Sequence, residues 1–298
     1  MKAVTTAPIA VITGGNVGIG KETARALVAK GYRVLIAARS RQRAETAIAE
    51  IASTAGPQAH QIEYLALDLA DLASVRAATA QIEARCPRLD LLVANAGLIA
   101  SPRSETRDGF ETTFGVNHLG HFALIEGLRD RLTFSAPARV VIVASTAHKS
   151  SRGLDFDDLQ RTKRRYGSWA AYCDSKLANV MFARELGRRL DGTGVVAHSL
   201  HPGFVNSEFG GGGDVGGALR PLLNLSKKVF AISPEKGAKT TIHVATSAEA
   251  GAVTGRYWSN SRLATPSKAA LDDGAAKKLW EISESLTNKN SASRSRPR

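Results

Sequence analysis

The sequence predicts an α/β fold, with a single doubly wound parallel sheet of about seven strands and helices on both faces. Apolar, β-branched runs of strand length alternate with longer segments of helical period along most of the chain. Runs such as VVIVA (140–144) are apolar without alternation, which is typical of strands that are buried on both faces. No repeat or linker divides the pattern, so we expect one domain over residues 1–287.

The predicted elements follow one another in regular order. Strands are expected at 8–13, 33–38, 62–67, 89–94, 139–144, 195–200 and, more weakly, 255–259. Helices are expected near 19–30, 41–54, 72–85, 108–133, 169–190 and 234–247. Because strands and helices alternate, right-handed crossovers should join the strands. The span 204–228 contains GGGGD (210–214), has no clear period and follows the carboxyl end of a strand, where such sheets bind ligands. We expect it to be a substrate lid.

The chain is strongly basic, with 40 Lys and Arg residues against 27 Asp and Glu residues and a net charge of +13. Part of the excess lies in the tail 288–298, which we expect to be disordered because it is polar and contains no acidic residue. No aromatic-interleaved or zinc-finger pattern accompanies the basic residues, so a nucleic-acid partner is not favoured. Two further clusters stand where an anionic small molecule could bind: Arg39, Arg41 and Arg43, and Arg161, Lys163, Arg164 and Arg165.

The N-terminal stretch MKAVTTAPIAVITGG lacks the order of charged, long apolar and cleavage-site segments that defines a signal peptide. No apolar run reaches the roughly 18 residues that span a bilayer. We therefore expect a cytoplasmic protein without a transmembrane anchor. Cys86 and Cys173 match no ligand spacing and are expected to be free thiols, and no cluster has the spacing of a metal site, so we expect no metal.

The stretch VITGGNVGIGK (11–21) predicts a phosphate-binding turn. A strand leads into Gly14, Gly18 and Gly20, and a helix follows. Glycine lets the backbone turn sharply and approach a pyrophosphate, which then sits on the free N–H groups at the helix N-terminus. The spacing is G-x-x-x-G-x-G, and Thr23 stands where the G-x-G-x-x-G fingerprint would have its third glycine. A purely structural turn of the same composition is the alternative.

The end of the second predicted strand reads AARSRQR, with Arg39 where an NAD site would offer a carboxylate to the adenosine ribose. A guanidinium at this place can bind a 2′-phosphate through two hydrogen bonds. We therefore expect NADP(H) as the cofactor. Surface arginines that merely open a helix are the alternative.

The stretch YCDSK (172–176) places a phenol and an ammonium one helical turn apart, so both should lie on one face. A phenol near pKa 10 is a poor proton donor or acceptor at neutral pH. A cation one turn away, together with the positive charge of an oxidised nicotinamide, should lower that pKa. Ser145 stands at the end of a predicted strand, where its hydroxyl can donate to a developing alkoxide. A half-buried tyrosine beside a solvated lysine is the alternative.

Seven motifs in this order resemble those of the short-chain dehydrogenase/reductases, over residues 8 to 287. They are TGGNVGIG (13–20), DL (68–69), NAG (95–97), NHLG (117–120), Ser145, YCDSK (172–176) and HPG (201–203). NHLGHF, AYCDSKLAN and the C-terminal GRYW and TPSKAALDDGAAKKLWEISESL are similar to the retinol dehydrogenase branch. The resemblance implies a Rossmann-type fold and, in residues 1–287, a dinucleotide-binding catalytic domain.

The resemblance also implies roles for single residues. Tyr172 would be the general acid/base, Lys176 its activator, Ser145 the group that orients the carbonyl or alcohol, and Asn117 the support of a proton-relay water. Ser207 stands where the family has a threonine. His118, His121 and His201 are expected to be structural. The implied cofactor contacts are Gly14, Asn16, Gly18, Ile19, Gly20, Arg39, Asp68, Leu69, Asn95, Ala96, Gly97, Tyr172, Lys176, Pro202, Gly203, Val205 and Ser207.

The function expected is an NADP(H)-dependent oxidoreductase that transfers hydride between the nicotinamide and an apolar aldehyde or ketone, or the corresponding alcohol. A catalytically silent dinucleotide-binding sensor is the alternative. The helix 169–190 resembles one through which relatives form a four-helix contact, which implies a homodimer or homotetramer. The substrate pocket is expected between the insertion 148–168 and the span 204–228, and it would be apolar. Its expected lining is Leu98, Ile99, Phe156, Trp169, Phe204, Leu222 and Leu223.

Overall fold

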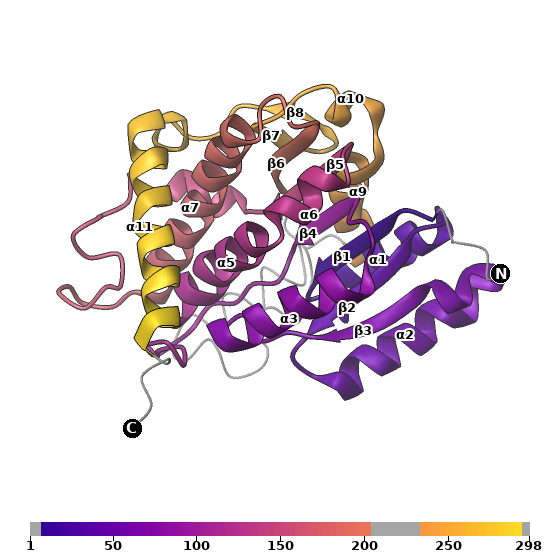
Figure 1. Cartoon of the computed structure of the whole chain (residues 1–298). Helices are drawn as coiled ribbons and strands as arrows, with labels where there is room; N and C mark the ends of the chain where they lie inside the picture. The colour runs from indigo at the N-terminus through magenta and orange to yellow at the C-terminus, as the bar shows by residue number, and fades with distance from the viewer. Residues whose placement is uncertain (1–6, 204–232, 294–298) are drawn as a thin grey trace.

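The protein is described by a computed structural model that covers residues 7–203 and 233–293, with side chains up to residue 288. Eight strands of the described chain form one sheet in the order β3-β2-β1-β4-β5-β6-β7-β8 (Figure 1). The strands are β1 Ile9–Thr13, β2 Arg33–Ala38, β3 Ile62–Ala66, β4 Leu91–Ala94, β5 Ala138–Val143, β6 Val195–His201, β7 Arg256–Ser259 and β8 Arg262–Ala264. The seven predicted strands are confirmed, and they pair in parallel.

The predicted parallel sheet is thereby confirmed, and the structure adds an eighth strand at one edge, where β8 runs antiparallel to β7. The two strands are joined by Asn260 and Ser261, which both have positive φ values, 49° and 59°. Two central residues of this kind form the turn that matches the twist of a β-hairpin. The hairpin makes β8 a short edge strand of three residues, and a run that short carries no period of its own in the sequence.

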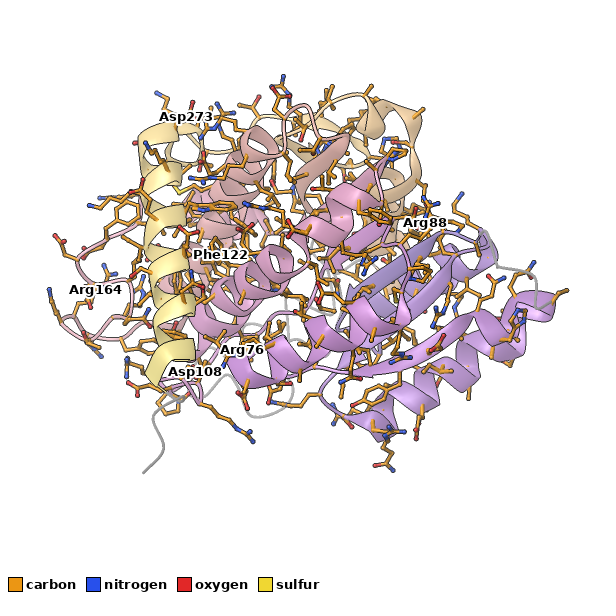
Figure 2. All side chains as sticks on the ribbon, in the orientation of Figure 1. Arg76, Arg88, Asp108, Phe122, Arg164 and Asp273 are labelled. Atoms are coloured by element: carbon orange, nitrogen blue, oxygen red, sulfur yellow. The ribbon has the colours of Figure 1, made fainter. Side chains whose placement is uncertain are left out.

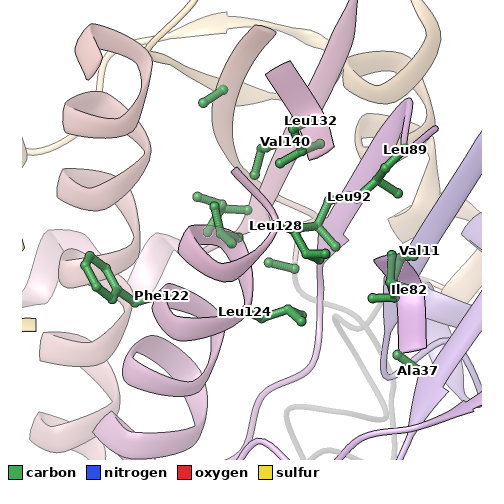
Figure 3. Packing of buried hydrophobic residues seen from close by; sticks show 14 of the residues in the cluster. Val11, Ala37, Ile82, Leu89, Leu92, Phe122, Leu124, Leu128, Leu132 and Val140 are labelled. Carbon is green, nitrogen blue, oxygen red and sulfur yellow. The ribbon is translucent and has the colours of Figure 1, made fainter. Parts of the chain in front are cut away.

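Helices cover both faces of the sheet. The first face is covered by α1 Gly18–Ala29, α2 Arg41–Ala55, α9 Pro234–Thr246 and α10 Ala248–Gly251. The second face is covered by α3 Leu72–Arg85, α5 Gly120–Gly127, α6 Arg129–Phe134 and α7 Ser168–Arg189. Figure 3 shows part of the apolar cluster on this second face, with Val11 and Val140 from strands and Phe122 and Leu124 from α5.

A long helix near 108–133 was predicted, and the structure instead breaks this segment into four pieces. These are α4 Thr112–Phe114, the π-helix Gly115–Leu119, α5 and α6. Gly120 packs so tightly that a Cβ there would lie 2.5 Å from the carbonyl oxygen of Leu69. Such an approach of helix and loop depends on tertiary packing, which helical periodicity does not reveal.

The last helix, α11 Asp273–Ser293, was not predicted, and it runs past residue 288, where we expected the tail to begin. It lies along α7 and α5 on the outside of the molecule (Figure 1), and Asp273 marks its first turn (Figure 2). Residues 171–187 of α7 are all buried within the chain except Asp174 and Arg184. In the described chain, α7 therefore has no free apolar face for the four-helix contact expected between subunits.

Among the described residues, no helix combines the length and the apolar character needed to cross a membrane.

Candidate active site

The residues singled out from the sequence gather at the carboxyl edge of the sheet. Thr13 ends β1, Asn95 directly follows β4, and Ser145 lies two residues after β5. The chain reverses direction across the sheet between β1 and β4, because β2 and β3 lie on one side of β1 and β4 on the other. In open α/β sheets ligands bind at this switch point.

The glycine turn has the geometry of a pyrophosphate site. Gly14 and Gly18 have positive φ values, 64° and 55°, which glycine adopts without strain. Gly20 packs directly on the backbone carbonyl of Gly14, and a Cβ at residue 20 would also lie 2.6 Å from the Asn95 amide nitrogen. No side chain caps the N-terminus of α1, and its first turn contains no acid. The N–H groups there can therefore bind a phosphate.

Thr13 and Asn95 hold this turn against the next loop. The Thr13 hydroxyl oxygen accepts hydrogen bonds from the backbone N–H groups of Asn95 at 2.9 Å and Ala96 at 3.0 Å. The Asn95 side chain donates to the carbonyl oxygen of Thr13 at 2.9 Å. The side chain of Asn95 is thus used to fix the glycine turn.

Asn117 lies in the π-helix and its side chain holds the loop after β4. Its amide oxygen accepts from the Leu98 N–H at 2.8 Å, and its amide nitrogen donates to the Leu98 carbonyl at 2.9 Å and to the Ser175 hydroxyl at 3.0 Å. The Ser175 hydroxyl in turn donates to the Tyr172 carbonyl at 2.8 Å. Asn117 therefore joins the cofactor loop to the helix that carries Tyr172.

Tyr172 and Lys176 lie on one side of α7, as predicted from their spacing. The Lys176 Nζ is 5.6 Å from the centre of the Tyr172 ring and donates a hydrogen bond to the Val143 carbonyl at 3.1 Å. The Ser145 hydroxyl is hydrogen-bonded to Tyr172 and also accepts from the Ala147 N–H at 3.2 Å. A Cβ at Gly97 would lie 3.2 Å from the Asn117 amide oxygen and 3.3 Å from Lys176 Nζ, so a larger residue would have to displace these two side chains.

Burial dominates the pKa values of this pair. It raises the pKa of Tyr172 to about 12, although the Ser145 hydrogen bond acts in the opposite direction. Burial also lowers the pKa of Lys176 to about 8. The lowered pKa expected from the sequence applies to the phenol with the oxidised nicotinamide bound, and in the chain alone burial acts in the opposite direction. Desolvation penalises both charged forms, and it is the largest cause of both shifts.

The other predicted cofactor contacts line the same edge. Arg39 is exposed at the end of β2, and among the described residues it takes part in no ion pair. Asp68 is half-buried, and one of its carboxylate oxygens accepts from the Ala70 N–H at 3.0 Å. Pro202 and Gly203 follow β6, with Gly203 at φ +87°. Val205 and Ser207 lie outside the described residues.

The predicted substrate pocket is only partly described. Ile99 forms a small apolar cluster with Tyr172 and Cys173, and the Trp169 ring lies 5.6 Å from that of Tyr172 with half of its surface exposed. Phe156 packs against the apolar cluster that α7 and α11 share, and Lys278 Nζ lies over its ring. The lid 204–228, with Phe204, Leu222 and Leu223, lies outside the described residues.

The basic cluster near residue 161 is largely used within its own loop. Arg161 is buried and forms an ion pair with Asp174 at 2.5 Å. Arg164, labelled in Figure 2, pairs with Asp155 at 3.2 Å. These pairs order the insertion and leave fewer cations for an anionic ligand than the sequence pattern indicated.

Sequence reasoning missed the residues that connect the predicted ones. Thr13, Ser175 and the buried Glu111, whose carboxylate accepts from the Thr113 and Phe114 N–H groups, were not singled out. His121 was expected to be structural, and it bonds both Thr13 and the Asn117 carbonyl. The available signal was spacing: His121 is four residues after Asn117 and Ser175 three after Tyr172, which places each pair on one helical face.

A family model described as short chain dehydrogenase matches residues 8–155. Retinol dehydrogenase 14 of Mus musculus is 42% identical over 282 residues, which cover 92% of this chain and 84% of that protein. Retinol dehydrogenase 12 of Homo sapiens is 43% identical over 275 residues, with the same two coverages. These proteins are similar to this chain over most of both lengths.

Solved structures agree with this result. The crystal structure of an uncharacterized protein from Mycobacterium paratuberculosis has a TM-score of 0.75 and 35% identity, and the match covers 94% of this chain and 93% of that one. RhlG of Pseudomonas aeruginosa, solved as an NADP active-site complex, has a TM-score of 0.66 and 27% identity, with 84% and 93% covered.

The fold and the glycine turn define a protein of the Rossmann-type, dinucleotide-binding class, and the relatives make it an NAD(P)-dependent oxidoreductase. The sequence similarity gives a more specific assignment: the chain belongs to the short-chain dehydrogenase family, in the branch of the retinol dehydrogenases.

Proposed function

We propose that this protein is an NADP(H)-dependent carbonyl reductase or alcohol dehydrogenase acting on apolar aldehydes, ketones or the corresponding alcohols. The observation that carries the proposal is the buried Tyr172 phenol, hydrogen-bonded to Ser145 and one turn from the Lys176 ammonium, beside the glycine turn. The nicotinamide, when bound, supplies or accepts the hydride. The chain itself must then orient the carbonyl and move one proton.

The four proposed catalytic residues divide that work. The Ser145 hydroxyl orients the substrate oxygen, and the Tyr172 phenol, held neutral by burial, donates a proton to it during reduction. Lys176, whose pKa of about 8 leaves it mostly protonated at neutral pH, returns the proton to Tyr172. Asn117 supports the water that refills Lys176. A neutral phenol is the form that can donate a proton, which is the step that carbonyl reduction requires of this residue.

NADP(H) is proposed over NAD(H) because Arg39 is a cation without an ion-pair partner in the described chain, at the end of β2. The substrate class is proposed from the apolar Ile99 cluster and the exposed Trp169 indole beside Tyr172. The relatives named retinol dehydrogenases make a polyene aldehyde the first compound to assay. A cytoplasmic location is part of the proposal and can be tested by cell fractionation.

The decisive experiment follows NADPH oxidation with apolar aldehydes, ketones and quinones. We expect turnover by the wild-type protein and a fall in kcat of at least about 100-fold in Tyr172→Phe, since a general acid typically contributes 10²- to 10⁴-fold. Tyr64→Phe, a half-buried phenol on β3, is the control and should keep its activity. Tight NADPH binding with no activity that Tyr172→Phe alters would favour the silent sensor instead.

A further inference from the structure

His121 links the cofactor side of the site to its catalytic side. Its Nε2 lies 2.9 Å from the Thr13 hydroxyl, and its Nδ1 lies 3.1 Å from the Asn117 carbonyl oxygen. A carbonyl oxygen can only accept, so Nδ1 carries the proton. Nε2 is then free to accept from the Thr13 hydroxyl. The ring is 1% exposed, and burial lowers its pKa to about 4, so it is neutral at physiological pH.

The contacts of Thr13 extend this link to the cofactor loop. While its proton is donated to His121, the hydroxyl oxygen accepts from the N–H groups of Asn95 and Ala96. One imidazole and one hydroxyl therefore join the end of β1, the loop after β4 and the π-helix. A displacement of any one of the three segments must strain these bonds.

The Asn117 carbonyl is the group that matters for proton transfer. The amide oxygen of the Asn117 side chain accepts one hydrogen bond, from the Leu98 N–H. Its amide nitrogen donates two, to the Leu98 carbonyl and to the Ser175 hydroxyl. The side chain is thereby committed to Leu98 and Ser175, so in the proposed function the backbone carbonyl of Asn117 is the group that accepts from the relay water. Lys176 lies close enough that its charge is one cause of the lowered pKa of His121. Because the His121 ring is neutral, it does not add a second positive charge next to Lys176.

We propose that His121 is a positioning residue that, as a neutral imidazole, fixes the Asn117 carbonyl relative to Lys176 and couples it to the loop Asn95–Ala96. The inference rests on the proposed function, because the carbonyl serves proton delivery to Tyr172. His121 itself touches neither substrate nor cofactor in this role.

The test compares two buried histidines with the same pattern of bonds. His198 also donates to a carbonyl, that of Ala250 at 2.9 Å, and accepts from a side chain, Trp258 Nε1 at 3.1 Å, but it lies within β6 away from Lys176. Leucine removes the same two bonds at either position. We expect His121→Leu to lower kcat about 10- to 100-fold, because small misplacements of catalytic groups cost that much. His198→Leu should lower the melting temperature and change kcat by less than about twofold.

Three further readouts separate positioning from mere stability. The NADPH dissociation constant of His121→Leu should stay within about threefold of wild type, since Thr13 keeps both loop amides. The solvent deuterium isotope effect on kcat should rise, because proton delivery becomes slower. His121→Gln should restore much of kcat, as its amide can donate to the carbonyl and accept from Thr13.

The possible failures are distinguishable. If wild-type protein shows no turnover with any carbonyl compound, the proposed function is overturned, and this inference with it. If wild-type protein turns over but His121→Leu loses no more kcat than His198→Leu, the inference alone is overturned. It is equally overturned if nitrogen-15 NMR finds His121 protonated on Nε2 at neutral pH.

Discussion

At the scale of single residues, burial sets the charge states of this site more strongly than neighbouring charges do. Tyr172 and Lys176 are four residues apart, yet the pKa of the phenol rises and that of the amine falls. Each group is taken out of water together with its partner, and desolvation destabilises phenolate and ammonium alike. A phenol held neutral in this way can give its proton to a substrate oxygen without first having to gain one.

In the proposed function, Arg39 determines the preference for NADP(H) over NAD(H). Replacing it in Arg39→Asp removes the guanidinium and adds a charge that repels a 2′-phosphate. We expect the KM for NADPH to rise roughly 10- to 100-fold, because charge-assisted hydrogen bonds contribute about 1.5–3 kcal/mol, while the KM for NADH falls. Arg41→Ala is the control, since Arg41 already pairs with Glu45 and covers Tyr64. An unchanged KM for NADPH would argue against the assignment.

Two buried histidines predict an acid-sensitive fold. Burial lowers the pKa of His118 to about 3 and that of His121 to about 4, whereas both return to about 6.5 on unfolding. Between those values the unfolded chain binds more protons, so stability is complete above pH 6.5 and falls as the pH drops through this window. The loss at pH 5 should be on the order of 2 kcal/mol per histidine.

Urea unfolding at pH 7.5, 6 and 5 measures this dependence. His118→Leu removes one of the two groups, so its stability should decline less between pH 7.5 and 5 than that of wild type. Carboxylates titrate in both proteins and cancel in the comparison. Equal declines in the two proteins would show that His118 does not contribute.

At the scale of elements, the loop 95–100 is held by the segment that carries Asn117. Besides the two Asn117 bonds to Leu98, the Ala100 N–H donates to the Thr113 hydroxyl at 3.0 Å. Tyr166, from the insertion 148–168, donates to the Ala100 carbonyl at 3.0 Å and lies 2.8 Å from the Glu111 carboxylate. The insertion thus supports the loop that carries Gly97, a proposed cofactor contact, and Ile99, a proposed pocket residue. Both parts of the proposed site therefore depend on the same supporting segment.

The same elements show how far the sequence could predict this structure. Strands such as β5 were found because a run buried on both faces is apolar at every position. Tyr172 and Lys176 were placed together because spacing fixes the face of a helix. The π-helix was not predicted, and Gly120 at its end packs closely on Leu69, 51 residues earlier in the chain, a tertiary contact that helical period does not encode. For α11 a signal existed: Ala276, Leu279, Trp280 and Ser283 are buried at helical spacing.

At the scale of the whole molecule, α11 packs on α7 and α5, the first of which was expected to contact a partner subunit. Trp280 is 2% exposed, and its ring centre lies 5.1 Å from that of Phe122 and 5.6 Å from that of Phe182, while Arg189 covers its other side. Ser283 bonds His118 of the π-helix at 2.8 Å. The first turn is fixed by Asp273, which pairs with Arg184 at 2.7 Å. The helix α11 therefore packs over α7 and α5, and it is hydrogen-bonded to the π-helix.

Trp280→Ala tests this arrangement. Removing a buried indole should lower the free energy of unfolding by about 3–5 kcal/mol, because a cavity opens between α5, α7 and α11. It should also expose the aromatic cluster and cause association that wild-type protein does not show, measurable by light scattering after gel filtration. Glu281→Ala, an exposed neighbour on the same helix, should change neither quantity. If the wild-type protein already associates and Trp280→Ala abolishes that association, α11 is itself an interface and does not replace one.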